Sequence, residues 1–188
     1  MAAADAKSWI NLERAYVLVL DGNPQGSAIL RQLLAGFGVR HAIQCATAAE
    51  AQAVCRDTEL DLIVASDSLT DMSGYDFVHW LRRAGIDPNS FTPVISIGGH
   101  TRRSDVSKAR DCGANFLVTK PFSPAVLLER IVWSAKDGRP FLQVGEYFGP
   151  DRRFRKDPPP ETGERRKGPG LGVPPRSSAA GGVQGSAA

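Results

Sequence analysis

Five short, mostly apolar runs recur along the first two thirds of the chain, and they constrain the fold more than any other feature. The first run ends in the turn residues Asp21-Gly22-Asn23-Pro24. Near-continuous apolar strands, unlike alternating ones, are typical of a parallel sheet that is covered on both faces. The predicted strands are Ala15–Leu20, His41–Ala46, Asp61–Ala65, Pro93–Ile97 and Asn115–Val118.

The segments that follow these runs have the composition or the apolar spacing of helices. The last of them begins with Ser123 as N-cap and Pro124 in the first turn. The predicted helices are residues 29–37, Ala48–Arg56, Tyr75–Arg83, Arg103–Cys112 and Pro124–Ser134. Five strands that alternate with five helices predict a doubly wound α/β domain of the flavodoxin-like type, with strand order 2-1-3-4-5. In this architecture the functional site lies at the carboxyl ends of the strands.

The composition changes after Lys136, where Pro, Gly, Arg and Ser become frequent. Residues 136–188 hold 10 Lys and Arg against 6 Asp and Glu, whereas residues 1–135 hold 13 and 14. The excess positive charge predicts an anionic partner for the C-terminal part. We therefore divide the chain into an N-terminal extension (1–14), an α/β domain (15–135), an arginine-rich segment (136–167) and a disordered tail (168–188).

Within the arginine-rich segment, four residues are expected to dock loosely on the domain: Phe141, Val144, Tyr147 and Phe148. No apolar run approaches the roughly 20 residues of a membrane span, and the first 14 residues lack the apolar stretch of a secretion signal. The three cysteines have no CxxC spacing, and the histidines have no metal-ligand spacing. These features predict a cytoplasmic protein without a metal site.

Four motifs occur in the order and spacing of one known domain. They are VLVLDGNP at 17–24, DLIVASDSLTDMSGYDF at 61–77, PVISIGG at 93–99 and VTKPF at 118–122. Together they make residues 15–135 resemble a response-regulator receiver, the CheY-like fold. The resemblance implies an acidic pair and an aspartate that bind Mg²⁺, of which the aspartate accepts a phosphoryl group. It also implies a Ser or Thr and a Lys that contact the phosphate.

This chain departs from that pattern at most of the positions that carry the chemistry. The acidic pair is reduced to Asp21-Gly22, and Gly98 replaces the hydroxyl residue. Counting five residues on from Asp61 or eight back from Gly74 places Ser66, not an aspartate, at the acceptor position. Only Lys120 matches fully. We therefore expect neither aspartyl phosphorylation nor Mg²⁺, and we expect Asp21, Ser66 and Lys120 to remain as remnants, with Asp21 and Lys120 as an ion pair.

One alternative is that Asp67 takes the acceptor role. A shift by one residue would send the side chains of the third strand to the opposite faces of the sheet, which argues against it.

The arginine-rich segment contains a repeated unit. Gly149-Pro150-Asp151-Arg152-Arg153 recurs 13 residues later as Thr162-Gly163-Glu164-Arg165-Arg166. An arginine fork pairs with O6 and N7 of guanine, and a carboxylate suits the N1–H and N2–H donors of the same base. Further arginines can stack on the ring or pair with phosphate. Two copies therefore suit a ligand with two guanines and two phosphates, which describes cyclic di-GMP.

A degenerate CheY-like domain followed by YFGPDRRFR and GERRK resembles the CheY-like cyclic di-GMP effectors, the Cle family. The resemblance implies a non-enzymatic protein whose arginine-rich segment binds cyclic di-GMP and which then engages the flagellar motor switch to adjust motility and surface attachment. It also implies recruitment to the flagellated cell pole. The matching residues are Asp151, Arg152, Arg153, Glu164, Arg165 and Arg166, with Arg155 and Phe154 as weaker candidates.

Three other interpretations remain open on the sequence. The arginines could keep a tail soluble or bind nucleic acid or anionic lipid, although interspersed carboxylates weaken pure phosphate binding. The chain could instead be a phospho-regulated receiver, or a constitutive receiver adaptor, in two-component signalling. Arg102-Arg103-Ser104-Asp105 also has an RxxD spacing that suits guanine, but polar residues are ordinary at a helix start.

Overall fold

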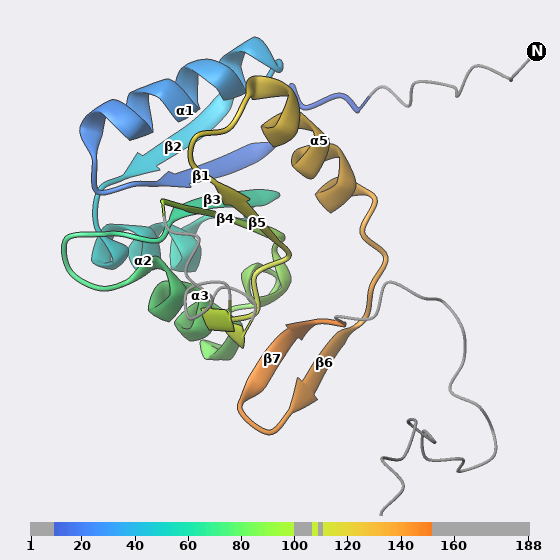
Figure 1. Cartoon of the computed structure of the whole chain (residues 1–188). Helices are drawn as coiled ribbons and strands as arrows, with labels where there is room; N and C mark the ends of the chain where they lie inside the picture. The colour runs from blue at the N-terminus through green and yellow to red at the C-terminus, as the bar shows by residue number, and fades with distance from the viewer. Residues whose placement is uncertain (1–9, 100–106, 109–110, 152–188) are drawn as a thin grey trace, which may run out of the picture. The chain divides into compact units, whose positions relative to one another are not determined.

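The computed structural model describes residues 10–99, 107, 108 and 111–151, and its centre is a five-stranded parallel sheet. The strand order is β2-β1-β3-β4-β5, which confirms the predicted topology (Figure 1). The strands are β1 (Tyr16–Leu20), β2 (His41–Cys45), β3 (Leu62–Ser66), β4 (Val94–Gly98) and β5 (Phe116–Thr119). Every residue of β3 and β4 is buried, as expected for central strands with both faces covered.

Helices cover both faces of the sheet (Figure 1). They are α1 (Pro24–Gly36), α2 (Ala48–Asp57), α3 (Gly74–Arg83) and α5 (Pro124–Ala135), with a short 3₁₀ helix η1 (Asn89–Phe91) before β4. Apolar residues of α1 and α5 form one core with alternate strand residues such as Val64, and those of α2 and α3 form the other with residues such as Ile63. Ser107, Lys108 and Asp111 have helical backbone, and most of the helix predicted at 103–112 lies outside the described residues.

The helix starts follow from local sequence. Ser123 caps α5 and Pro124 occupies its first turn, as predicted. At α2, Thr47 and Glu50 form a reciprocal capping box, and the carboxylate of Asp71 accepts from the N–H groups of Ala48 and Ala49 at 2.9 and 3.0 Å. These caps fix the helix ends that border the sheet.

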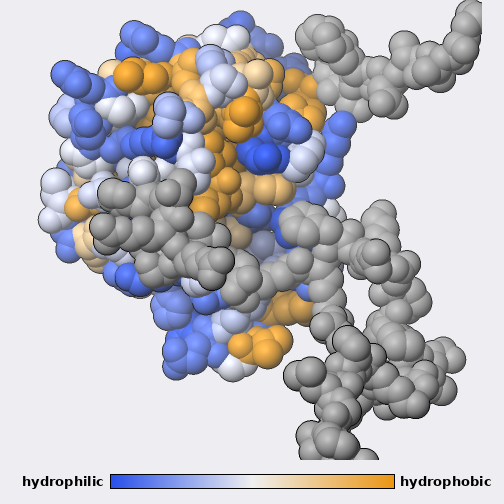
Figure 2. Space-filling model, viewed as in Figure 1, coloured by the Kyte–Doolittle hydropathy of each residue, from blue (hydrophilic) through white to orange (hydrophobic). Residues whose placement is uncertain are grey.

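A β-hairpin follows α5, where the sequence predicted only loose docking. It consists of β6 (Phe141–Val144) and β7 (Tyr147–Pro150), which pair antiparallel and are joined by Gly145 and Glu146. Phe91 packs edge-on against Phe141 and Phe148, with ring centroids 5.2 and 5.9 Å apart. Val144 does not dock, since its side chain is 69% exposed. Figure 2 shows apolar side chains at the lower end of the coloured surface, where the hairpin lies.

Two glycines let the hairpin approach the domain backbone to backbone. Gly113 has φ +94°, and a Cβ atom there would lie 2.3 Å from the carbonyl oxygen of Phe148. A Cβ atom on Gly149 would lie 2.7 Å from Cα of Gly113. The hairpin therefore belongs to the same compact unit as the sheet. Within the part of the chain that the structure describes, no helix is long and apolar enough to cross a membrane.

Candidate functional site

The carboxyl end of the sheet brings the predicted remnants of a receiver site to one edge. The register pairs Leu20 with Ala65, so the next residues along the two chains, Asp21 and Ser66, lie at the same edge of the sheet. Gly98 pairs with Thr119, so Lys120 follows at the end of β5. The parallel topology alone produces this gathering, because all five strands end on the same side.

Asp21 is buried at this edge, with an exposed fraction of 3%. Its Oδ1 atom accepts from the N–H of Asn23 at 2.9 Å, and its Oδ2 atom lies 3.6 Å from Nζ of Lys120. Oδ2 accepts no hydrogen bond from the described residues. Gly26 makes room for this carboxylate, because a Cβ atom there would lie 2.5 Å from Oδ2. The sequence-predicted ion pair is thus present, with a separation beyond hydrogen-bond length.

Ser66 is the last residue of β3 and is 2% exposed, whereas Asp67 is the first residue beyond the strand. Oδ2 of Asp67 accepts from the N–H of Gly99 at 3.1 Å. A Cβ atom on Gly98 would lie 3.0 Å from that oxygen. The Asp67 carboxylate therefore lies against the end of β4, in the space toward which a hydroxyl side chain at position 98 would project.

The residues at this edge do not fit the Mg²⁺ that the fold family implies. Mg²⁺ needs several hard oxygen ligands in a near-octahedral arrangement. Asp21 offers one carboxylate that already faces Lys120, and Ser66 offers a neutral hydroxyl. The carboxylate of Asp67 accepts from the N–H of Gly99. Among the described residues, no group of three or more His, Cys, Asp or Glu side chains is placed to hold a metal ion.

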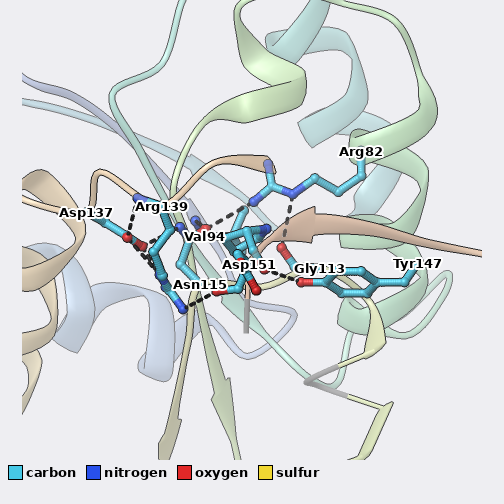
Figure 3. Close-up of polar contacts among 9 residues, drawn as sticks. Arg82, Val94, Gly113, Asn115, Asp137, Arg139, Tyr147 and Asp151 are labelled. Carbon is cyan, nitrogen blue, oxygen red and sulfur yellow. Dashed lines mark hydrogen bonds and ion pairs between the residues drawn. The ribbon is translucent and has the colours of Figure 1, made fainter. Parts of the chain in front are cut away.

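The opposite, amino end of the sheet holds a dense polar network around Arg82, which Figure 3 shows. Arg82 belongs to α3 and is 2% exposed. Its Nε atom donates to the carbonyl of Gly113 at 3.1 Å, and its Nη1 atom donates to the carbonyls of Ser90 and Thr92, both at 2.8 Å. Burial lowers the pKa of Arg82 to about 10, so the guanidinium stays charged at neutral pH. A buried cation thus joins α3, the η1 turn and the start of β5.

Asn115 extends this network to the chain that follows α5 (Figure 3). Its Oδ1 atom accepts from Arg82 at 3.2 Å and from the N–H of Val94 at 3.0 Å. Its Nδ2 atom donates to Asp137 at 3.2 Å. The side chain of Arg139 donates two more hydrogen bonds to Asp137, at 2.7 Å from Nε and 2.6 Å from Nη2. This two-point pairing is the strong, directional form of an arginine–carboxylate contact.

The network ends at Asp151, the first residue of the predicted nucleotide-binding set. Nη1 of Arg139 donates to the carbonyl of Asp151 at 3.1 Å, and the N–H of Asp151 donates to the carbonyl of Pro140 at 2.8 Å. The six other residues of that set lie outside the described residues: Arg152, Arg153, Arg155, Glu164, Arg165 and Arg166.

Asp137 and Arg139 shift each other's pKa. Burial alone would raise the pKa of Asp137, but the hydrogen bonds from Arg139 and Asn115 outweigh it and leave the pKa below its ordinary value. The pKa of Arg139 is raised, chiefly by its hydrogen bonds to Asp137. Sequence reasoning missed both residues. A usable signal was Gly145, because a glycine in the first position of a two-residue loop between apolar residues indicates a hairpin.

The three cysteines are free and buried. Burial raises the pKa of Cys45 to about 11, that of Cys55 to about 12 and that of Cys112 to about 11. The thiols are therefore neutral at physiological pH, as expected for small apolar packing residues.

The comparisons with known proteins agree with the fold of the sheet and its helices. The sequence resembles the transcriptional regulatory protein KdpE of Mycobacterium tuberculosis, with 36% identity over 117 residues, 61% of this chain and 48% of that protein. The chain therefore spans about half the length of the first curated relatives it matches. It also resembles the chemotaxis protein CheY of Pseudomonas aeruginosa, with 24% identity over 61% of this chain and 91% of that protein.

Solved receiver structures have the same fold. The CheY-like receiver domain protein of Methanospirillum hungatei superposes with a TM-score of 0.59 at 21% identity, covering 65% of this chain and 94% of that one. CheY4 of Vibrio cholerae superposes with a TM-score of 0.57 at 24% identity, covering 63% and 96%. Residues 17–132 match the response regulator receiver domain as a family. With this match across most of its length and the five-stranded order of its sheet, the chain belongs to the response regulator receiver domain family.

Proposed function

We propose that this protein is a non-enzymatic effector that binds cyclic di-GMP through its arginine-rich segment and then engages a protein partner, the flagellar motor switch, to control motility and surface attachment. The observation that carries the proposal is the repeated unit of an acid followed by two arginines, at 151–153 and 164–166. Each unit offers a carboxylate for one edge of guanine and an arginine fork for another.

The carboxyl end of the sheet supports a signal other than phosphorylation. A receiver that responds to a phosphoryl group needs an acceptor carboxylate, a metal site and a hydroxyl residue, and here Ser66 and Gly98 stand at two of those positions. The carboxylate of Asp67, the neighbouring residue, accepts a hydrogen bond from the N–H of Gly99. A receiver fold that has lost this chemistry can still bind protein partners, and the nucleotide then provides the input.

Calorimetry on the full-length chain tests the nucleotide part. We expect the wild type to bind cyclic di-GMP and to prefer it strongly over cyclic di-AMP, because adenine lacks the O6 acceptor and the N1–H and N2–H donors. The double variant Arg152→Ala/Arg165→Ala, which removes one arginine from each unit, should lose at least about tenfold in affinity, since each bidentate pair contributes roughly 1–3 kcal/mol.

The matched control removes two positive charges from residues 136–188 that lie outside the repeated units and the motifs around them, as Lys136→Ala/Arg176→Ala. We expect its affinity to stay within about twofold of wild type at 150 mM salt, where exposed charges more than about 8 Å apart are screened. Equal losses in the two double variants, or equal binding of both dinucleotides, would show a general polyanion-binding tail. No heat with the wild type would overturn the nucleotide part altogether.

The partner part is tested separately by measuring binding of the purified motor switch protein with and without cyclic di-GMP. We expect binding to strengthen in the presence of the nucleotide, because ordering of the arginine-rich segment presents a new surface. Equal binding in both conditions would instead support a constitutive receiver adaptor.

A further inference from the structure

At Asp151, the start of the first acid–Arg–Arg unit, both the backbone N–H and the backbone carbonyl form hydrogen bonds. The N–H of Asp151 donates to Pro140 at 2.8 Å, and its carbonyl accepts from Arg139 at 3.1 Å. The preceding carbonyl, that of Pro150, accepts from the hydroxyl of Tyr147 at 2.6 Å. Two consecutive peptide units at the end of β7 thus have fixed hydrogen-bond partners.

The residue that holds Asp151 is itself held by the sheet domain. The side chains of Arg139 and Asp137 are only 16% and 8% exposed, and they pair at two points. Asp137 is in turn bound by Asn115, which lies between the start of β4 and Arg82 (Figure 3). An unbroken series of hydrogen bonds therefore connects the core of the domain to the carbonyl of Asp151.

A guanidinium is suited to this task for a geometric reason. Its planar fork uses two edges at once: Nε and Nη2 face Asp137, while Nη1 is directed at Asp151. The centroid of the Phe116 ring lies 5.6 Å from the guanidinium carbon, within the range of a cation–π contact. A lysine carries the same charge but has no such fork, so it cannot make both contacts in a fixed orientation.

We propose that Arg139, held by Asp137 and Asn115, is a positioning residue for nucleotide binding: it fixes the chain at Asp151 so that the first acid–Arg–Arg unit begins from a preset point on the domain. This inference rests on the proposed function, and it adds that the hairpin and the domain contribute to affinity without touching the ligand. The physical basis is preorganisation, because a binding segment whose first residue is already fixed loses less conformational entropy when the ligand binds.

The test is calorimetry with cyclic di-GMP on full-length Arg139→Ala and Arg139→Lys. We expect both variants to bind about tenfold more weakly than wild type, with the loss in the entropy of binding. If Arg139 acted only by attracting phosphate, Arg139→Lys would restore wild-type affinity, and that result would overturn the proposal. Hydrogen exchange supplies an independent readout: the amide of Asp151 should lose protection in both variants, whereas amides in β3 should keep theirs.

Arg83→Ala is the matched control. Arg83 also donates to a hairpin carbonyl, that of Glu146, but at the turn, away from Asp151. We expect its affinity to equal that of wild type. If Arg83→Ala weakened binding as much as Arg139→Ala, the effect would be general loosening of the hairpin, and the positioning role would be wrong.

Asp137→Asn serves if Arg139→Ala fails to fold, because it keeps the shape of the side chain and removes the charged pairing. Wild-type affinity in that variant would also overturn the proposal. The two hypotheses fail in different ways. If the wild type does not bind cyclic di-GMP, the proposed function is wrong. If the wild type, both Arg139 variants and Asp137→Asn bind equally well, only the positioning role is wrong.

Discussion

The two ends of the parallel sheet differ in how their buried polar groups are satisfied. At the carboxyl end, where receivers carry out phosphorylation, Asp21 keeps one oxygen without a hydrogen bond from the described residues and meets Lys120 only at 3.6 Å. At the amino end, Arg82 makes four hydrogen bonds, and Asn115, Asp137 and Arg139 continue the network. The difference teaches that the more extensive buried polar network of the described residues lies at the end of the sheet opposite the family's reaction site.

Buried polar networks contribute when every member is satisfied and cost free energy when one is not. The network around Arg82 meets this condition, since none of its side chains has a buried nitrogen or oxygen without a partner among the described residues. It joins four separate segments: α3, the η1 turn, the start of β5 and the chain after α5. The carboxyl end does not meet the condition, because the buried Oδ2 atom of Asp21 accepts no hydrogen bond from the described residues. The stability of the protein should therefore depend strongly on one end and weakly on the other.

The largest expected effect is that of Arg82→Met, which keeps the apolar stem and removes the buried cation. Three carbonyls would lose the donor that Arg82 supplies, and Asn115 would lose one of its two donors, so we expect a loss of about 3–5 kcal/mol in the free energy of unfolding. Guanidinium chloride denaturation measures it. The neighbouring Arg83→Met is the control and should change stability by less than about 1 kcal/mol, since Arg83 is exposed. Equal values for the two would remove the contrast between the ends of the sheet.

Gly113→Ala is expected to have the next largest effect. The residue has φ +94°, and the new Cβ atom would meet the carbonyl oxygen of Phe148 at 2.3 Å. We expect a loss of about 1–3 kcal/mol together with displacement of the hairpin, visible as shifted amide resonances for β6 and β7. Gly138→Ala, where a Cβ atom would meet nothing within 4 Å, is the matched control. A hairpin that stays in place in Gly113→Ala would contradict the described packing.

Acid should release the Asp137–Arg139 pair. The pKa of Asp137 is lowered in the folded protein, so its pairing stabilises the fold above the unfolded value of about 3.9 and is lost as the pH falls through the lower, folded value. We expect amides of the hairpin to lose protection below about pH 4 and to keep it between pH 5 and 7. Hydrogen exchange against pH measures this, and Asp137→Asn should abolish the pH-dependent step.

The smallest expected effect is that of Lys120→Met at the carboxyl end. The Lys120 side chain is 41% exposed and its nitrogen lies 3.6 Å from Asp21, so we expect a change of less than about 1 kcal/mol. Thermal unfolding at low and high salt measures it. A loss as large as that of Arg82→Met would show that the carboxyl end is a structural centre of the molecule after all.

The sheet and its helices could be predicted because their signals are local: apolar runs, helical spacing and caps each lie within about ten residues. The predicted third strand, Asp61–Ala65, differs from β3, Leu62–Ser66, by one residue at each end. The contact of Asp67 with Gly99 could not be predicted, because it depends on the register of β3 against β4.

The burial of Arg82 was equally hidden. Its partners are carbonyls and an amide from residues 90, 92, 113 and 115, which no local pattern connects. The hairpin was missed for another reason: it lies in a stretch whose overall Pro, Gly and Arg content is typical of disorder, and its four-residue strands are too short to stand out.

The close approach of Gly113 and Gly149 gives a criterion for recognising relatives of this kind. A receiver chain with a side chain larger than hydrogen at either position cannot seat this hairpin without moving its backbone. Searching receiver sequences for a glycine three residues before the fifth strand, together with a glycine in a short strand pair beyond the last helix, would separate chains that carry this extension from those that end at the receiver fold.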